Sequence, residues 1–209
     1  MARGRFGVWY ERQLLARILD RGMRGVDPLR ADLLAPAAGR VIEIGFGTGA
    51  NLPYYPAAVT SLVAVEPSHG LASHARARLA HWGRPHEVLE RFGGEDLPFP
   101  DASFDVAVIT FVLCSARRIA PLLAQTRRLL KPGGPLLLAE HIAAAPGPLR
   151  TLQTALRPAW KACLGGCDPT SDPRSALLAA GFETSGLHTL ALGLPLVVRP
   201  GLVGVATAV

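Results

Sequence analysis

The residues with the most evident chemical use are an acid and three glycines at the end of a short apolar run. Segment 40–45 reads RVIEIG and continues into the pattern Glu43-x-Gly45-x-Gly47-x-Gly49. Glycine permits a positive φ and lets the backbone approach a ligand, and a helix that follows offers unpaired N–H groups. A tight turn without a ligand uses the same residues, so the loop alone leaves both interpretations open.

The spacing of the glycines narrows the kind of nucleotide. Gly45 and Gly49 are four residues apart, whereas the dinucleotide fingerprint places its third glycine five residues after the first, and no Gly-Lys-Ser/Thr follows for a P-loop. Glu66 ends the next apolar run, 17 residues after Gly49. An acid there can accept both hydroxyls of a ribose, although a solvated strand end would look the same. Loop and acid together predict an adenosine-type ligand without a pyrophosphate.

Short β-type runs and helical stretches alternate around these residues. This alternation predicts a parallel sheet with helices on both faces. The predicted strands are 40–45, 61–67, 86–92, 104–110 and 135–142, the predicted helices are 50–55, 69–82, 117–130, 149–163 and 173–180, and two further apolar segments are 186–192 and 202–208.

Composition limits the classes of protein. A chain of 209 residues with 49% hydrophobic and 18% charged residues predicts one compact domain and excludes disorder. Of the net charge of +6, the first 30 residues carry 7 − 3 = +4, so no basic groove for nucleic acid is indicated. Three cysteines form no disulfide framework or zinc spacing, which predicts a reducing cytosol and no metal. The charged N-terminus is no secretory signal, and no stretch is long enough to span a bilayer.

A basic amphipathic helix is predicted near the N-terminus, because Phe6, Trp9, Tyr10, Leu14 and Ile18 recur at helical spacing with arginines between them. Its apolar stripe needs a cover. The helix could close over the cofactor site, lie on an anionic membrane through residues 3–24, or simply pack on the core. We therefore divide the chain into a helical cap, 1–37, and a main domain, 38–209.

The main domain resembles the class I S-adenosylmethionine-dependent methyltransferases. The resemblance rests on five motifs in order: VIEIGFGTG (41–49), AVEP (64–67), GGEDLPFPDASFDVAV (93–108), LLKPGG (129–134) and LLLAEH (136–141). It implies a doubly wound, Rossmann-like sheet of seven mostly parallel strands with the last strand antiparallel. It also implies S-adenosylmethionine as cofactor and a small molecule as substrate.

The resemblance assigns the cofactor contacts in three groups. The glycine loop holds the amino-acid part, the acid at 66 holds the ribose, and the segment around 95 flanks the adenine, with Leu97 and Phe99 as apolar walls. Many relatives have Gly-Asp-Ala-Glu where this chain has 92–95 as Phe-Gly-Gly-Glu, so Glu95 is the remaining polar candidate. The implied residues are Glu43, Gly45, Phe46, Gly47, Gly49, Glu66, Pro67, Gly94, Glu95, Asp96, Leu97, Thr110 and Phe111.

A narrower similarity indicates the acceptor. The segments NLPYYP (51–56), FVLCS (111–115), AEHI (139–142), PAW (158–160), GGC (165–167) and VRP (198–200) resemble the alkyl thiol S-methyltransferases and their bacterial relatives. The chain departs from them at Gly201, where relatives have a histidine, so no role of that histidine carries over. Because NLPYYP also occurs in bacterial phospholipid N-methyltransferases, a lipid amine stays open as acceptor, as does a quinone carbon.

Methyl transfer is an in-line displacement in which positioning supplies most of the rate. The site is expected beyond the carboxyl ends of the first and fourth strands, which places Thr110 and Phe111 beside the methyl group and His141 at the end of the fifth strand. His141 could take a proton from a thiol or be a structural, hydrogen-bonded residue. Cys114, Cys163 and Cys167 are expected to be structural.

Two other classes remain as alternatives. A nucleic-acid enzyme is disfavoured because the fourth strand ends in Thr-Phe-Val-Leu rather than Asn/Asp-Pro-Pro-Tyr/Phe, and a cofactor-binding module without turnover would keep the glycine loop and Glu66. The expected protein is a cytoplasmic enzyme, free or peripheral at a membrane, and a monomer or homodimer.

Overall fold

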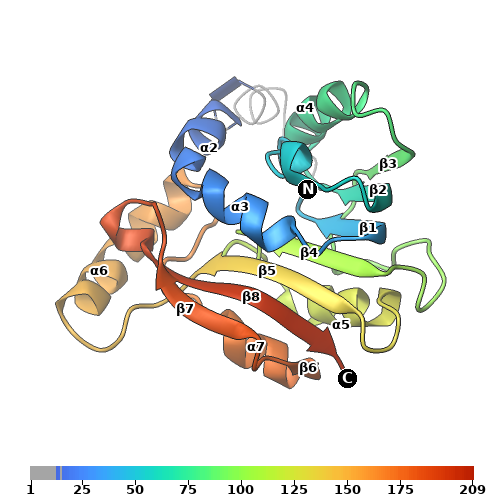
Figure 1. Ribbon diagram of the computed structural model, residues 1–209. Helices are drawn as coiled ribbons and strands as arrows, with labels where there is room; N and C mark the ends of the chain where they lie inside the picture. The colour runs from blue at the N-terminus through green and yellow to red at the C-terminus, as the bar shows by residue number, and fades with distance from the viewer. Residues whose placement is uncertain (1–12, 15) are drawn as a thin grey trace.

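The computed structural model describes residues 13–14 and 16–209, and it shows a central sheet between two layers of helices (Figure 1). Phe6, Trp9 and Tyr10 of the expected N-terminal stripe lie outside the described residues. The helices are α2 (Ala16–Gly22), α3 (Asp27–Leu34), α4 (His69–Leu79), α5 (Ile119–Leu129), α6 (Pro148–Cys163) and α7 (Pro173–Ala179), with short 3₁₀ turns η2 (Arg24–Val26), η3 (Leu52–Tyr54) and η4 (Leu196–Val198). The strands are β1 (Gly39–Ile44), β2 (Val59–Val65), β3 (His86–Leu89), β4 (Val106–Thr110), β5 (Pro135–His141), β6 (Phe182–Glu183), β7 (Leu187–Ala191) and β8 (Pro200–Ala208).

The sheet has the order β3-β2-β1-β4-β5-β8-β6, with parallel pairing from β3 to β5 and antiparallel pairing at β8. The expected doubly wound, mostly parallel sheet is therefore confirmed. It has eight strands rather than seven, because β6 and β7 both pair with β8, at its two ends, and 184–186 separates them. A Cβ on Gly186 would lie 2.6 Å from the Val205 carbonyl oxygen, so only glycine fits there, and the Gly186 carbonyl oxygen accepts a hydrogen bond from the Val205 N–H (3.2 Å).

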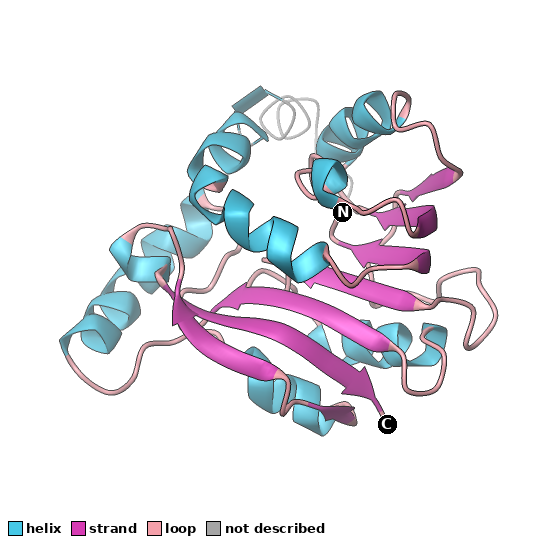
Figure 2. Cartoon of the chain, in the orientation of Figure 1, coloured by secondary structure: helices cyan, strands magenta, loops and turns pink. Residues whose placement is uncertain are grey.

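Alternation along the buried strands divides the apolar core into two layers. Helices cover both faces of the sheet (Figure 2). In β1, Val41 packs with residues of α3 and α4, whereas Ile42 and Ile44 pack with residues of α5 and α7 on the opposite face. The same alternation turns Glu43 toward the face that α3 covers. Polar side chains gather at the carboxyl ends of the parallel strands: Glu66 follows β2, Thr110 ends β4 and His141 ends β5.

Most predicted elements are confirmed, with ends that differ by a few residues. The helix predicted over 50–55 is wrong, since only the 3₁₀ turn Leu52–Tyr54 forms there. Pro56 forces Tyr55 into an extended conformation (φ −69°, ψ 121°), and this ends the turn after three residues.

The described part of the N-terminal helix contacts the glycine loop. The apolar stripe, which could pack on the core, is exposed in this part. Leu14 and Ile18 are 46% and 39% exposed, so this part of the stripe has no cover. Asp20 of α2 instead accepts hydrogen bonds from Thr48 Oγ1 (2.5 Å) and Arg78 Nη2 (2.7 Å). Of the three expectations for this helix, closure over the glycine loop fits these contacts. Within 13–14 and 16–209, no helix is long and apolar enough to cross a membrane.

Candidate active site

The glycine loop has the backbone that its sequence predicts. Gly45, Gly47 and Gly49 all have positive φ, at 74°, 60° and 86°. A Cβ on Gly45 would lie 2.3 Å from Val112 Cγ2, so the loop passes directly beside the segment that follows β4. Phe46, between the first two glycines, is buried in the core layer of α3 and α4. The loop therefore follows β1 in the chain and packs against the end of β4. This leaves the glycine backbone at the carboxyl ends of both strands, where a cofactor is expected to bind.

Glu66, directly after β2, is bonded to this loop. Its Oε2 accepts a hydrogen bond from the Gly47 N–H (2.8 Å) and its Oε1 accepts one from the Ser68 N–H (2.8 Å). Burial raises the pKa of Glu66, and the two N–H donors partly offset that rise. Each carboxylate oxygen has a second lone pair, which suits a pair of ribose hydroxyl donors. Pro67 follows at the exposed edge.

Glu43 lies inside a polar network and not at an open surface. Its Oε1 accepts a hydrogen bond from Asn51 Nδ2 (2.8 Å), and its Oε2 accepts one from Tyr55 Oη (2.6 Å). Asn51 Nδ2 also donates to Thr110 Oγ1 (3.0 Å), and Asn51 Oδ1 accepts from Arg30 Nη1 of α3 (2.5 Å). Burial raises the pKa of Glu43 to about 7. The network joins α3, β1 and β4 behind the glycine loop.

Sequence reasoning missed the supporting members of this network. Asn51 and Tyr55 lie in the NLPYYP segment, which indicated a family but no role, and Arg30 lies in the expected cap. Arg30 is 5% exposed and donates to Asn51, so α3 of the expected cap contacts the polar network of the main domain.

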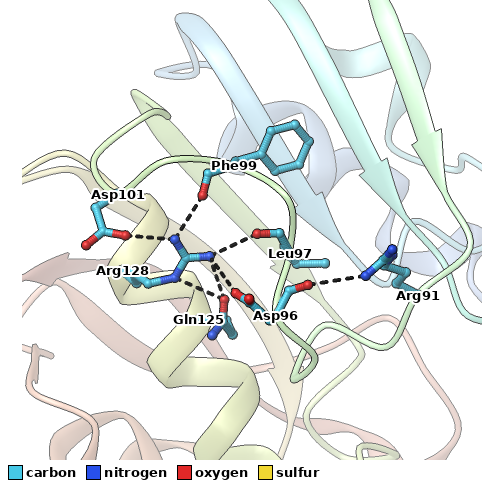
Figure 3. A network of polar contacts seen from close by, with 7 residues as sticks. All are labelled: Arg91, Asp96, Leu97, Phe99, Asp101, Gln125 and Arg128. Carbon is cyan, nitrogen blue, oxygen red and sulfur yellow. Dashed lines mark hydrogen bonds and ion pairs between the residues drawn. The ribbon is translucent and has the colours of Figure 1, made fainter.

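A second loop, residues 92–101, follows β3 and is held by Arg128 of α5. The Arg128 guanidinium donates to the carbonyl oxygens of Leu97 (3.1 Å) and Phe99 (2.9 Å) and pairs with Asp101 (2.7 Å), as Figure 3 shows. A Cβ on Gly93 would lie 2.3 Å from Ile44 Cγ2, so the beginning of the loop packs tightly against the end of β1. The second loop is thereby fixed at the same edge of the sheet as the glycine loop.

The residues predicted to flank the adenine occupy different environments in this loop. Gly94 is partly buried, and the side chain of Glu95 is exposed. Asp96 is also exposed, and Leu97 is 2% exposed in the core layer of α5 and α7. Phe92, which sequence reasoning passed over, is 58% exposed at the start of the loop.

Phe99, the second residue expected as a wall of the adenine pocket, packs near the opposite edge of the sheet. Its ring packs edge-on against Phe104 (5.2 Å between centroids) and lies 5.4 Å from the Arg40 guanidinium carbon. Arg40 and Phe104 are near the amino ends of β1 and β4, opposite the glycine loop. The chain from Leu97 to Phe99 therefore turns away from the site.

The end of β4 has an unusual backbone. Phe111 has a positive φ of 58°, which is strained for an aromatic residue, and its N–H donates to the Ala139 carbonyl oxygen (2.7 Å). The next two N–H groups, of Val112 and Leu113, donate to Glu140 Oε1 at 2.6 and 2.7 Å. Burial raises the pKa of Glu140 to about 7. β5 thus shapes the segment after β4 through one buried carboxyl group.

Beside this segment, the structure brings together Cys114, His141 and Cys167. One potential ligand atom from each lies within 4.8 Å of the others, and His141 Nε2 is 2.9 Å from Cys167 Sγ. Hydrogen bonding with Cys114 and the adjacent imidazole lower the pKa of Cys167 to about 5. Burial lowers the pKa of His141, but the hydrogen bond and charge of Cys167 together with the charges of Glu140 and Asp168 outweigh it and raise that pKa. We call these three residues the thiol–imidazole cluster.

Sequence spacing gave no sign of this cluster, because its members are 27 and 26 residues apart. One signal was present: each member belongs to a different segment of the thiol methyltransferase resemblance, FVLCS, AEHI and GGC. The expectation that Cys114 is buried is confirmed. An open apolar hollow of about 520 Å³ begins at Ile142, the residue after His141. It is lined by residues 142–149 together with Thr189 and Pro200, and not by the cluster itself.

A glycine cradle at the carboxyl end of β1, an acid after β2 and this strand order together define a methyltransferase that binds S-adenosylmethionine. Residues 42–138 match the methyltransferase domain family. Human thiol S-methyltransferase TMT1A is 33% identical over 172 residues, which are 79% of this chain and 69% of that protein. The chain belongs to the S-adenosylmethionine-dependent methyltransferases.

Two further similarities complete the comparison. Phosphatidylethanolamine N-methyltransferase of Cereibacter sphaeroides is 31% identical over 119 residues, which are 56% of this chain and 58% of that protein. A chain of the Haloferax volcanii complex between the Trm112 methyltransferase activator and a methyltransferase has a TM-score of 0.70 at 17% identity. That match covers 100% of this chain and 99% of the other, and at this identity it shows the fold alone.

Proposed function

We propose that the protein transfers a methyl group from S-adenosylmethionine to the sulfur of a small apolar thiol. The observation that carries this proposal is the thiol–imidazole cluster, which lies at the carboxyl ends of β4 and β5. A neutral thiol is a weak nucleophile and must lose its proton, so a thiol methyltransferase needs a group that favours the thiolate. The apolar hollow next to His141 suits the alkyl part of such an acceptor.

The residues of the two loops would hold the cofactor, which when bound supplies an electrophilic methyl group on a sulfonium. Gly45, Gly47 and Gly49 leave room for its amino-acid part, and Glu66 accepts the ribose hydroxyls. Glu95 and the exposed ring of Phe92 lie on the loop that we assign to the adenine. The fit rests on the three positive-φ glycines and on the carboxylate lone pairs of Glu66.

The end of β4 and the cluster would act on the acceptor. Phe111 places the backbone beside the reacting groups. Thr110 acts as a positioning residue, because its hydroxyl accepts a hydrogen bond from Asn51. His141 acts within the cluster, which favours the thiolate form of the acceptor sulfur as the thiol proton leaves to water. The chain then has to align two sulfur atoms on either side of one carbon, and this alignment supplies most of the rate.

A panel of acceptors with methyl-labelled cofactor tests this proposal. It compares alkyl thiols, hydrogen sulfide, phosphatidylethanolamine and quinone precursors. We expect labelled thioether from the alkyl thiols and little label elsewhere. Label that enters only the lipid amine or only the quinone would overturn the assignment of a thiol acceptor.

A membrane-bound acceptor is the second candidate, and the surface of α2 favours it. Leu14 and Ile18 are exposed, and Arg17 and Arg21 are exposed beside them. Apolar side chains among arginines are typical of helices that lie on anionic membranes. Flotation with anionic liposomes tests this contact, by comparing the intact chain with the variant Leu14→Glu/Ile18→Glu. Equal flotation of both proteins would contradict membrane contact through Leu14 and Ile18.

A further inference from the structure

The thiol–imidazole cluster has the donor atoms of a metal site. Two cysteine sulfurs and one imidazole nitrogen lie within 4.8 Å of one another. Tetrahedral zinc, with Zn–S of about 2.3 Å and Zn–N of about 2.0 Å, holds two sulfurs and one nitrogen about 3.5 to 3.8 Å apart. Small side-chain movements would therefore bring the three atoms to bonding distance of one ion.

The donor set also selects the kind of ion. Sulfur and imidazole ligands favour zinc and other thiophilic metals, whereas magnesium and calcium prefer oxygen ligands. Three protein ligands with an open fourth position are typical of zinc sites that bind a reacting molecule, since structural zinc sites usually have four protein ligands.

The backbone holds all three ligands in place. His141 is the last residue of β5, and its carbonyl oxygen accepts a hydrogen bond from Ser171 Oγ (2.9 Å). The Cys114 carbonyl oxygen accepts one from the Asp168 N–H (2.8 Å), which ties the segment containing Cys167 to the end of β4. Ligands from three separate segments are thus preorganised, as a metal site requires.

Polar side chains surround the cluster. Trp160 interacts with Cys167, and Glu140 interacts with Cys114. His141 Nδ1 is buried without a hydrogen-bond partner among the described residues, whereas Nε2 of the same ring faces Cys167 Sγ. Nε2 is therefore the imidazole nitrogen that is placed to bind an ion together with the two sulfurs.

We propose that Cys114, His141 and Cys167 bind one Zn²⁺ and that the fourth position of the ion takes the acceptor thiol. The second half of this inference rests on the proposed function. When the acceptor binds, its S–H bond breaks, a Zn–S bond forms, and the proton leaves to water. The zinc-held sulfur then forms the new S–CH₃ bond as the bond between the methyl group and the sulfonium of the cofactor breaks.

Metal titration of the purified full chain tests the first half, after chelation and in a thiol-free reductant. We expect one Zn²⁺ per chain by calorimetry, and with Co²⁺ a sulfur-to-metal charge-transfer band in the near ultraviolet. Cys167→Ser should weaken binding at least about 100-fold, because it removes one of three protein ligands. Cys167 is partly exposed, so this variant is the one chosen to keep the fold, with circular dichroism as the check.

Cys163→Ser is the matched control, because Cys163 is exposed, lies four residues away and is outside the cluster. It should bind Zn²⁺ like the unaltered chain. Absence of one-to-one binding, or equal loss in Cys163→Ser and Cys167→Ser, would overturn the metal site.

Addition of an alkyl thiol to the Co²⁺ form tests the second half without turnover. A new or stronger charge-transfer band supports thiol coordination. An unchanged spectrum overturns it, even if the thiol is methylated. Thiol methylation at full rate in metal-free protein would likewise refute the zinc role while leaving the proposed function intact.

Discussion

Arg128 offers a test of how the second cofactor loop is held. Arg128→Ala removes the hydrogen bonds to the carbonyl oxygens of Leu97 and Phe99. It also removes ion pairs with Asp96 and Asp101, whose side chains are 92% and 77% exposed. Such exposed pairs contribute little. The two carbonyl contacts of a guanidinium that is 26% exposed contribute about 1 kcal/mol each. The loop should therefore open more easily by about 2 kcal/mol, or about 30-fold.

Hydrogen exchange and calorimetry measure the effect. We expect faster amide exchange across 92–101 and a cofactor Kd raised about tenfold. Arg128→Lys should give an intermediate result, because one ammonium group keeps the charge but not the fork. Arg91→Ala is the control, since Arg91 is exposed and makes only a 3.3 Å contact with the Asp96 carbonyl oxygen in this network (Figure 3). Unchanged exchange and unchanged Kd in Arg128→Ala would refute the role of Arg128.

Three further predictions concern the acidic residues Glu66, Glu43 and Asp20. Glu66→Ala should raise the cofactor Kd about 100-fold by calorimetry, through loss of about 3 kcal/mol of ribose hydrogen bonds, while Glu87→Ala on the exposed face of β3 should leave it unchanged. The pKa of Glu43 is raised to about 7 by burial, so the folded state holds its proton between about pH 4.5 and 7, and the free energy of unfolding falls as pH rises through that window. Urea unfolding should show this fall reduced by about 3 kcal/mol in Glu43→Gln, and an identical pH profile would contradict it. Asp20→Ala removes the contacts of α2 with Thr48 and Arg78 and should speed cofactor dissociation about twofold in stopped-flow measurements, through a loss of about 0.5 kcal/mol at a partly exposed pair. An unchanged rate would argue against closure.

The fold was predictable because its signals are local. Buried parallel strands need continuous apolar runs, and the turn after β1 needs glycine where φ is positive, so both are visible in the residues themselves. Predictions from local sequence patterns were wrong where contacts between distant segments determine the secondary structure. The helix expected over 50–55 is reduced to one 3₁₀ turn because Pro56 follows it, and β6 and β7 both pair with β8, which is decided by contacts between distant segments.

Only part of the candidate site was predictable from local sequence signals. Gly45 and Glu66 reveal their use by their place after a strand. Arg30 and Arg128 act through contacts with residues far along the chain, Asn51 and the carbonyl oxygen of Leu97, so no pattern marks them. Cys114, His141 and Cys167 meet only because β4 and β5 are neighbours and the segment after α6 folds back onto them.

The thiol acceptor that we propose is tested most directly by incubating the full chain with methyl-labelled S-adenosylmethionine and an alkyl thiol, with Glu66→Ala beside it. We expect labelled thioether and demethylated cofactor in equal amounts, with both reduced in Glu66→Ala when the cofactor is not saturating. Cofactor binding without any labelled thioether, across alkyl thiols of different length, would contradict it.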